Sequence, residues 1–583
     1  MKDHYLLLVG ISLLNFLGIT LFITWGSLLL NISIQSYSII ISLLLCSLLL
    51  WKTLPGKSIS NVAEKKRVFK YIMAELLASL IICLLLAGAF HDFSYDGQNY
   101  QQEALIRLYQ GWNPFWDPAL SEDIPYSIWI NSYPKALWYF GTAVYQFTGL
   151  IETGKMFQGI LLLGTLFITY SALKFFLKSN VLCWLISLLL VANPVAIVQF
   201  FTFYVDGVLY LLLLALIALG YVRYFLSKQE EADCVILDIG IALAIIVLSN
   251  IKFTGLVYAS LFCTGWIFFN LFNRQRKTLL KLCTISLITS CLLVGYHPYI
   301  TNLIHHGHPF WPLMGKNSVD IITPNEHPDF LKQNRLTKVI WSTLATGRNN
   351  ADFSPAPMPE PRGTPELKIP FTFSQYELKL YESADTRIGG FGPWFSGILI
   401  CSVLLGSFLA LRHQTTLRNH FVFLITGLLI SILINPEAWW ARYAPQLWMI
   451  PLIILIYACY ITEIQTNPKL KYLTSLFLCI VVINSTLVVF LSVREQIYSE
   501  YQLQRQFKIV NEYIAKNHRS VLIDFSTFQA NRKRFQEKGI AYIAVDGGTQ
   551  LDIPCFQLAG SRTKVYIPDQ NLINELTKDE SIP

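Results

Sequence analysis

The sequence His91-Asp92-Phe93-Ser94-Tyr95-Asp96-Gly97-Gln98-Asn99-Tyr100 follows directly on an apolar run from Leu76 to Phe90, and it continues to Gly111-Trp112-Asn113-Pro114-Phe115. An ionised carboxylate is costly in lipid, so Asp92 and Asp96, at the edge of an apolar run, should face water or a polar cavity lined by protein. Two interpretations are open from this stretch alone. The acids either take part in chemistry on a membrane-bound substrate or are solvated acids of an interfacial loop.

The composition indicates a polytopic membrane protein. Of the 583 residues, 54% are hydrophobic and 14% are charged, and apolar runs of about 18 residues or more recur along most of the chain. The first run, Tyr5 to Ile32, is too long for the core of a signal peptide and lacks a small-residue cleavage site, so we interpret it as a span. The net charge of +8 comes from basic residues in short loops between apolar runs, as membrane topology requires, and does not imply nucleic acid as a partner.

The apolar runs predict an all-α membrane protein with about thirteen transmembrane helices. The loop 52–70 carries six Lys or Arg residues against one acid, Glu64, which predicts that this loop is cytoplasmic. The next span, about 71–90, then ends on the opposite face and places Asp92 and Asp96 outside. The later loops alternate in the same way, which leaves the amino terminus inside and the carboxyl terminus outside. Among the predicted spans are those at about 5–31, 34–51, 71–90, 157–177, 181–198, 394–411, 420–435, 446–463 and 472–492.

The segments between the spans divide the chain further. Residues 134–140 are too interrupted to span and suit a position at the membrane interface. In the tail, an apolar stretch at 521–525, a basic helical segment and a second apolar stretch at 540–545 predict a small α/β appendage. The predicted parts are 1–70 (two helices and the basic loop), 71–297 (a core with a first external loop, 91–156), 298–393 (a long external loop), 394–492 (the last helices) and 493–583 (the external tail).

Most ionisable residues near the outer ends of the predicted helices form one set. A transferase that moves a sugar from a lipid phosphate to a hydroxyl needs a carboxylate to deprotonate the acceptor. It also needs cations to hold the phosphate and to stabilise the leaving group. The set contains both kinds of residue: Asp92, Asp96, Glu103, Asp206, Lys252, His297, His305, His306, His308, Arg387, Glu437 and Arg442.

Histidines and cysteines are potential metal ligands of this sequence, and neither group has a spacing typical of a metal site. The stretch 296–313 holds three histidines within four residues, but metal ligands usually come from separated positions with defined geometry. An aromatic belt and a rigid turn at the interface are favoured there instead. The eleven cysteines lie mostly inside apolar runs without a CxxC spacing, which indicates small core residues and neither a disulfide framework nor a zinc site.

Two arginine-bearing stretches are typical of phosphate recognition. Arg387 precedes a run of glycines that let the backbone approach a ligand, although a flexible start to the following helix explains the same glycines. The sequence 434–445 brings Glu437 and Arg442 to the outer face among tryptophans, where an arginine suits a lipid phosphate. A structural pair between Glu437 and Arg442 is the alternative explanation.

Together these motifs resemble the GT-C superfamily of glycosyltransferases that use polyprenyl-phosphate sugars, most of all its bacterial mannosyltransferase-like and aminoarabinose-transferase-like members. The resemblance covers about residues 70–465. It implies an inverting transferase whose base is the first-loop acid, Asp96 or Asp92, with Asp206 as the second acid and Arg442-Tyr443 as the late arginine element. Asp96 is favoured because Gly97 lets substrate approach closely. The spacing of Asp92 and Asp96 departs from the commonest Asp-Glu pair of the family.

The resulting hypothesis is a glycosyltransferase in a bacterial plasma membrane, with its site facing the periplasm or exterior. Its partners are a polyprenyl-phosphate sugar, a glycan, lipid or protein acceptor and the bilayer. No cofactor is required, and a divalent cation is left open. Alternatives are a flippase or transporter of lipid-linked sugars and an oligosaccharide polymerase or ligase. The assigned roles are catalytic for Asp96, Asp92 and Asp206, phosphate-binding for Lys252, Arg387 and Arg442, and substrate-binding for Tyr100, Glu103, His297, Glu437 and Tyr443.

The predicted topology is testable by cysteine labelling. Because the 52–70 loop is strongly basic, a cysteine placed at Ser58 should react only from the cytoplasmic side, and one at Asp569 only from outside. Labelling of both positions from the same side would contradict the topology.

Overall fold

The computed structural model describes residues 5–54, 62–228, 234–270, 276–347, 364–412, 416–465, 467–545 and 551–577. Within these residues nine helices are long and apolar enough to cross a membrane, and four shorter apolar helices accompany them. These thirteen helices match the predicted spans, which confirms the all-α polytopic fold. The nine are Tyr5–Leu29, Val62–Ala89, Ile151–Leu173, Asp206–Leu226, Arg276–Val294, Phe395–Arg412, Leu417–Ile434, Pro445–Ile464 and Pro468–Asn517; the four are Tyr37–Thr53, Asn180–Val191, Val235–Ser249 and Phe253–Phe269.

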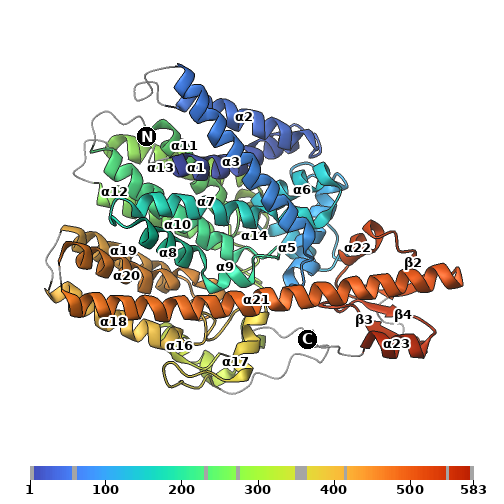
Figure 1. The fold of residues 1–583 in the computed structure, drawn as a ribbon. Helices are drawn as coiled ribbons and strands as arrows, with labels where there is room; N and C mark the ends of the chain where they lie inside the picture. Colours follow the sequence, from blue (N-terminus) through green and yellow to red (C-terminus); the bar gives the residue numbers. More distant parts are fainter. Residues whose placement is uncertain are drawn as a thin grey trace.

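The helices follow each other in chain order with short helical turns between them (Figure 1). The first half contains α1 (Tyr5–Leu29), α2 (Tyr37–Thr53), α3 (Val62–Ala89), η2 (Gly97–Gln101), α4 (Gln102–Tyr109), α5 (Ser127–Ser132), α6 (Ala136–Thr148), η3 (Ile151–Met156), α7 (Phe157–Leu173), α8 (Asn180–Val191), α9 (Pro194–Val198), α10 (Asp206–Leu226), α11 (Val235–Ser249), α12 (Phe253–Phe269), α13 (Arg276–Ile288), η4 (Thr289–Val294), η5 (Tyr296–Ile300) and α14 (Thr301–His306). The second half contains η6 (Thr323–Asn325), α15 (Pro328–Leu331), α16 (Arg335–Leu344), α17 (Gln375–Lys379), η7 (Leu380–Glu382), α18 (Phe395–Arg412), α19 (Thr416–Ile434), η8 (Ala441–Tyr443), η9 (Pro445–Trp448), α20 (Met449–Ile464), α21 (Pro468–Asn517), α22 (Asn531–Glu537) and α23 (Gln570–Thr577).

Helix α1 packs against α7 and α11, and most of its length is buried inside the protein. A Cβ atom on Gly10 would come within 2.8 Å of the Gly164 carbonyl oxygen, and one on Gly18 within 2.9 Å of Leu243. Small residues at helix crossings let backbones approach closely, and such packing drives helix association in lipid. The first helix is therefore part of the core and not an addition in front of it.

Two expectations about loops need correction. Residues 134–140, expected at the membrane interface, enter α6, whose residues Ala136 to Tyr145 are all buried in protein. Neighbouring helices cover the aromatic side chains that suggested an interfacial position. The predicted basic loop 52–70 lies partly outside the described residues, and α3 already begins at Val62, so Lys65 to Lys70 are helical.

Helix α21 links the bundle to the C-terminal domain. It contains 50 residues, which corresponds to about 75 Å at 1.5 Å per residue and exceeds the roughly 30 Å of a hydrocarbon core. Figure 1 shows it running along the bundle and continuing beyond it to the strands of the tail.

The tail forms the predicted α/β unit around a sheet of four short strands in the order β2-β1-β4-β3. Strands β1 (Val521–Asp524) and β2 (Tyr542–Ala544) are parallel. Strand β4 (Lys564–Tyr566) pairs antiparallel with β1 and with β3 (Cys555–Gln557). The core of this domain includes Leu503, Phe507 and Val510 of α21, so the long helix is part of the domain as well as its connection to the membrane.

Candidate active site

Six charged side chains from five separate stretches of the chain meet at one place. They are Asp96 before η2, Asp206 at the start of α10, Lys252 before α12, Asp385 and Arg387 in the loop before α18, and Arg442 in η8. Three carboxylates therefore face three cations. A set of buried charges is tolerable only when each is paired, and this set is balanced.

Arg442 lies at the centre of the cluster. Its Nε atom is 3.0 Å from Asp385 Oδ1, and its Nη1 atom is 3.5 Å from Asp96 Oδ2 and 4.0 Å from Asp206 Oδ2. The contact with Asp385 is an ion pair without hydrogen-bond geometry, because neither Arg442 Nε nor Asp385 Oδ1 has a hydrogen-bond partner. Among the described residues, its side chain makes one hydrogen bond, from Nη2 to the Tyr443 hydroxyl at 3.3 Å. Nη1 and one N–H of Nη2 are therefore without a hydrogen bond among the described residues, and a ligand could accept from them.

The other two cations are more fully engaged. Lys252 Nζ is 2.5 Å from Asp206 Oδ1 and 4.5 Å from the centre of the Tyr443 ring. Arg387 Nη2 donates to Asp385 Oδ2 at 2.9 Å, Nη1 donates to Asn325 at 3.2 Å, and the guanidinium stacks on Trp440. Arg387 therefore holds Asp385 in place beside Arg442.

Backbone pairing brings the two arginine-bearing stretches together. The Arg387 carbonyl accepts a hydrogen bond from the Ala441 N–H at 3.0 Å, and the Thr386 carbonyl accepts one from the Arg442 N–H at 3.1 Å. A Cβ atom on Gly390 would lie 2.7 Å from the Ala441 side chain, so a glycine is needed for this close approach. The arginines lie side by side because their backbones do.

Asp96 is the accessible acid of the cluster. Its side chain is 24% exposed, whereas those of Asp206 and Asp385 are 4% and 8% exposed. Burial raises the pKa of Asp96 above its usual range, and Arg442 partly opposes that shift. The pKa of Asp385 is lowered, because Arg387 and Arg442 outweigh the effect of its burial. A carboxylate with a raised pKa beside a cation fits a general base better than the tightly paired Asp385 does.

Aromatic side chains surround the charges. The Arg442 guanidinium lies 5.2 Å from the Tyr204 ring centre, 5.0 Å from that of Tyr443 and 5.5 Å from that of Trp440. Tyr100 packs edge-on against Tyr133, and burial is the main cause that raises the pKa of both phenols, with a smaller contribution from the nearby Asp96. Tyr100 and Tyr443, predicted to bind substrate, thus lie beside the cluster, whereas Tyr133 and Tyr204 were not singled out from sequence.

Asp92 has different surroundings from Asp96. Its side chain is fully buried, with Oδ1 accepting from the Ser94 N–H at 2.6 Å and Oδ2 from the Phe203 N–H at 2.7 Å. A carboxylate engaged in this way joins the two loops that lead to Asp96 and Asp206. The structure gives Gly97 a second role, and the close approach of substrate to it stays a prediction. A Cβ atom there would lie 1.9 Å from Asp92 Oδ2, so Gly97 makes room for Asp92.

Among the described residues, no hydrogen bond or ion pair joins three of the predicted substrate-binding residues to the cluster. Glu103 is buried between Arg107 and Arg532, with 2.7 and 2.8 Å ion pairs. His297 packs against Phe115 at the η5 turn. Glu437 accepts no ion pair from Arg442, which pairs with Asp385 instead. All three are near the predicted outer helix ends, but position along the chain does not show which direction a side chain takes.

The histidine-rich stretch contains no metal-binding geometry. His306 stacks on Trp311 with ring centres 3.5 Å apart, and His308 Nδ1 accepts from the Phe310 N–H. His305 is exposed. No group of three or more potential metal-ligating side chains occurs within the described parts of the chain, and the eleven cysteines are free thiols.

Asp385 is the cluster residue that sequence reasoning missed. The signal was present, because Asp385 stands two residues before Arg387 in a stretch already singled out for its arginine. An acid at that spacing looks like a local partner of the arginine. Only the structure shows that its second oxygen faces Arg442, 57 residues further along the chain.

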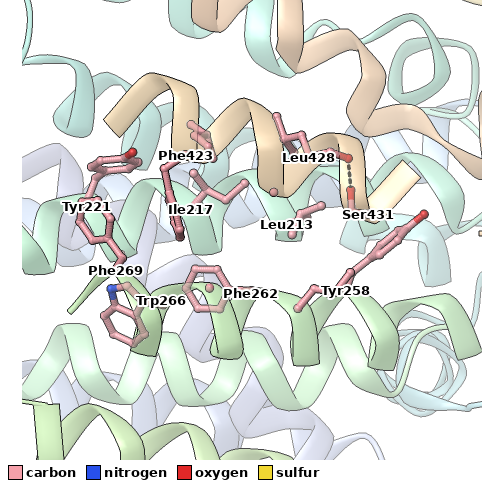
Figure 2. A pocket seen from close by; sticks show the side chains of 15 residues that line it. Leu213, Ile217, Tyr221, Tyr258, Phe262, Trp266, Phe269, Phe423, Leu428 and Ser431 are labelled. Carbon is pink, nitrogen blue, oxygen red and sulfur yellow. Dashed lines mark hydrogen bonds between the residues drawn. The ribbon is translucent and has the colours of Figure 1, made fainter. Parts of the chain in front are cut away.

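An apolar groove begins beside the cluster and extends between α10, α12 and α19. Figure 2 shows Phe262 and Trp266 on one side and Phe423 and Leu428 on the other, with Tyr258 and Ser431 at one end. The Tyr258 hydroxyl donates to the Tyr443 carbonyl at 3.1 Å, which connects that end of the groove to the charged cluster. The arrangement can hold an apolar chain along the groove with a polar head at Arg442.

A second apolar cavity lies on the other side of α19. It has a volume of about 650 Å³ and is lined by side chains of α16, α18, α19 and α20. Its size lies within the range of ligand pockets. No hydrogen bond or ion pair connects the described residues that line it to the charged cluster.

No family model and no curated protein matches the sequence. The chain is similar to the crystal structure of ArnT from Cupriavidus metallidurans bound to undecaprenyl phosphate. The two share 12% sequence identity, the alignment covers 86% of this chain and 99% of that chain, and the TM-score is 0.42.

Gly97→Ala tests the packing of the acid-bearing loop. Because the new Cβ would collide with the Asp92 carboxylate, we expect a loss of stability of about 1–3 kcal/mol, typical of overpacking in a filled site. Thermal unfolding of the purified protein measures it. Gly26→Ala in α1, where no atom lies within 4 Å of the new Cβ, is the matched control and should not lower the midpoint, because alanine favours a helix over glycine. Equal midpoints for both variants would contradict the packing described here.

Proposed function

We propose that this membrane protein is an inverting glycosyltransferase of the GT-C type, which transfers a sugar from a polyprenyl-phosphate donor to an acceptor hydroxyl. The observation that supports it most is the position of Asp96. It is a partly exposed carboxylate 3.5 Å from Arg442, whose Nη1 makes no hydrogen bond among the described residues. An apolar groove ends at Tyr258, which is hydrogen-bonded to the neighbouring Tyr443. A base, a phosphate-binding cation and a site for a lipid chain are the three elements that this reaction needs.

The donor would bind with its lipid in the groove and its phosphate at Arg442. A guanidinium binds two phosphate oxygens at once, and Arg442 has the donors to do so, since only Nη2 is in a hydrogen bond. Lys252 adds a second positive charge within the same cluster. Arg387 supports the arrangement indirectly, because each of its three nitrogens already donates to Asp385 or Asn325.

The chemical step is a single displacement. Asp96 removes the proton from the acceptor hydroxyl as that oxygen bonds to the anomeric carbon. The bond between the anomeric carbon and the phosphate oxygen breaks, and the polyprenyl phosphate leaves with an additional negative charge that Arg442 and Lys252 stabilise. Asp96 then returns the proton to solvent. For in-line attack the sugar has to lie between base and leaving group, so we expect the contact between Asp96 and Arg442 to open when donor binds.

The remaining roles follow from position. Asp206 holds Lys252, while Tyr100 and Tyr443 line the cluster where the sugar would lie. The acceptor is a glycan, lipid or protein hydroxyl. The basic 52–70 loop supports a site at the extracytoplasmic face of a bacterial plasma membrane.

Asp96→Asn should lower the transfer rate by at least about 10²-fold, because a neutral amide does not accept the acceptor proton. Retention of the polyprenyl-phosphate donor should be unchanged, since the arginine and the groove are intact. In vitro transfer by purified protein measures the rate, with the exposed Asp552→Asn as the matched control. A variant Asp96→Asn with near wild-type turnover would overturn the assignment of the base.

Arg442 variants test phosphate binding and the electrostatics of the base together. Arg442→Ala should raise the donor concentration needed for half-maximal rate by about tenfold or more, and Arg442→Lys should recover only part, because a lysine lacks the bidentate fork. Since Arg442 lowers and burial raises the pKa of Asp96, losing the arginine should move the acid limb of the pH–rate profile to higher pH.

The exposed Arg335→Ala on α16 serves as the control for this measurement. An unchanged donor requirement in correctly folded Arg442→Ala, or an acid limb that moves to lower pH, would count against the role of Arg442.

A further inference from the structure

The C-terminal domain contacts the acid-bearing stretch on both sides of Asp96. Before it, the Phe93 ring packs on Gly560, where an added Cβ would come within 2.4 Å of the ring. After it, Gln98 Nε2 donates to the Gly560 carbonyl at 2.7 Å, and Gln98 Oε1 accepts from Asn531 Nδ2 at 2.9 Å. Residues more than 400 positions apart in sequence are thus in direct contact two or three residues from the proposed base.

Tyr95, the residue next to Asp96, is held in the same way. Its ring packs edge-on against Phe528 with centres 5.5 Å apart, and the Arg562 guanidinium lies 5.3 Å from the ring centre. Its hydroxyl shares a 2.6 Å hydrogen bond with that of Tyr126. The contacts with Phe528 and Arg562 come from the C-terminal domain.

A buried arginine makes the most hydrogen bonds between the C-terminal domain and the stretch that carries Asp92. Arg534 of α22 is 1% exposed, and its Nε and Nη2 atoms donate to Glu152 Oε1 at 3.0 and 2.8 Å. Nη2 also donates to the main-chain carbonyl of Asp92. Glu152 Oε2 in turn accepts from the Asp92 N–H at 3.1 Å. The backbone of residue 92 is therefore held at its carbonyl by the tail and at its N–H by η3.

These bonds reach the active site through Asp92. Its carboxylate accepts from the backbone N–H of Ser94, two residues before Asp96, and from that of Phe203, three residues before Asp206. A shift of residue 92 would therefore move both acid-bearing loops. Misplacing a catalytic group by about 1 Å can cost roughly 10²-fold in rate.

Burying the charges of this network costs more free energy than attachment of the C-terminal domain to the bundle requires. Asp92, Glu152, Lys155 and Arg534 are all buried, and Lys155 pairs with Glu152 while donating to the Phe90 carbonyl at 2.7 Å. Desolvating four charges yields little net stability compared with apolar packing. The domain is already connected covalently by α21, so the directional bonds serve to fix a geometry.

We propose that the C-terminal domain is a working part of the active site, in which Arg534 acts as a positioning residue that fixes Asp96 through Asp92. This inference rests on the proposed function, because it assigns its role relative to Asp96 as the base. It gives a role to Asp92, whose carboxylate is buried and accepts two backbone hydrogen bonds, whereas the nearby Asp96 is partly exposed. It also gives the tail a function in catalysis, although none of its described residues makes an ion pair or hydrogen bond with Arg442.

The test compares full-length Arg534→Met and Arg534→Lys with Arg519→Met, an exposed arginine at the start of the same domain. Two quantities are measured: transfer kinetics at varied donor, and hydrogen exchange of the backbone in 91–101. Arg534→Met should lower kcat at least about tenfold with donor KM within twofold, and 91–101 should exchange faster while the transmembrane helices keep their protection. Arg534→Lys should be intermediate, because one ammonium does not reach both Glu152 and the Asp92 carbonyl as a fork does. Arg519→Met should match the wild type.

Asn531→Ala provides a second variant if Arg534→Met does not fold, since it removes the hydrogen bond to Gln98 without leaving a buried charge. It should lower kcat several-fold with unchanged donor KM. Wild-type kcat and wild-type exchange of 91–101 in Arg534→Met, or in Asn531→Ala where the first does not fold, would overturn the proposal. Absence of any transfer by the wild type would instead overturn the proposed function, and the exchange of 91–101 would still report whether the domain fixes this stretch.

Discussion

The guanidinium of Arg442 among three carboxylates is the interaction on which the site depends. Asp96, Asp206 and Asp385 are within 4.0 Å of it, and they come from three distant parts of the chain. A buried arginine needs opposite charge around it, and the nearby carboxylates keep the pKa of Arg442 well above its ordinary value despite burial. Because Arg442 keeps most of its hydrogen-bond donors unused, the pairing creates a charged site that remains open to an anion.

The fold positions this cluster by combining rigid helices with tightly paired loops. Asp206 begins α10 and Lys252 precedes α12, so the ends of two helices fix one acid and one base of the cluster, and later turns of the same helices line the apolar groove. The loops supply the remaining charges and are held by other means. Backbone hydrogen bonds hold Arg387 against Ala441, and Asp92 together with the C-terminal domain holds the stretch that carries Asp96.

The sequence was informative where one physical rule acts along the chain. Apolar length predicts the spans, and the cost of charge in lipid moves ionisable residues to helix ends, so Asp96, Asp206, Lys252, Arg387 and Arg442 were all recognised before their convergence was visible. The predictions that failed are those that depend on which way a side chain points in the folded protein. Glu103 is three residues beyond Tyr100, yet its side chain pairs with Arg532 of the tail. The side chain of Asp92 points to the Phe203 N–H, whereas that of Asp96 points to Arg442. No local pattern links residue 92 to Arg534, which is over 400 residues away.

Native mass spectrometry of the purified wild type with an equimolar mixture of polyprenyl monophosphate and polyprenyl diphosphate tests the central claim most directly. We expect a retained monophosphate adduct, because one guanidinium with unused donors near the end of an apolar groove matches one phosphate on one lipid chain. That adduct should be lost when Arg442 is replaced by alanine. Preferential retention of the diphosphate would favour an oligosaccharide polymerase or ligase, and retention of neither lipid would contradict a polyprenyl-phosphate donor.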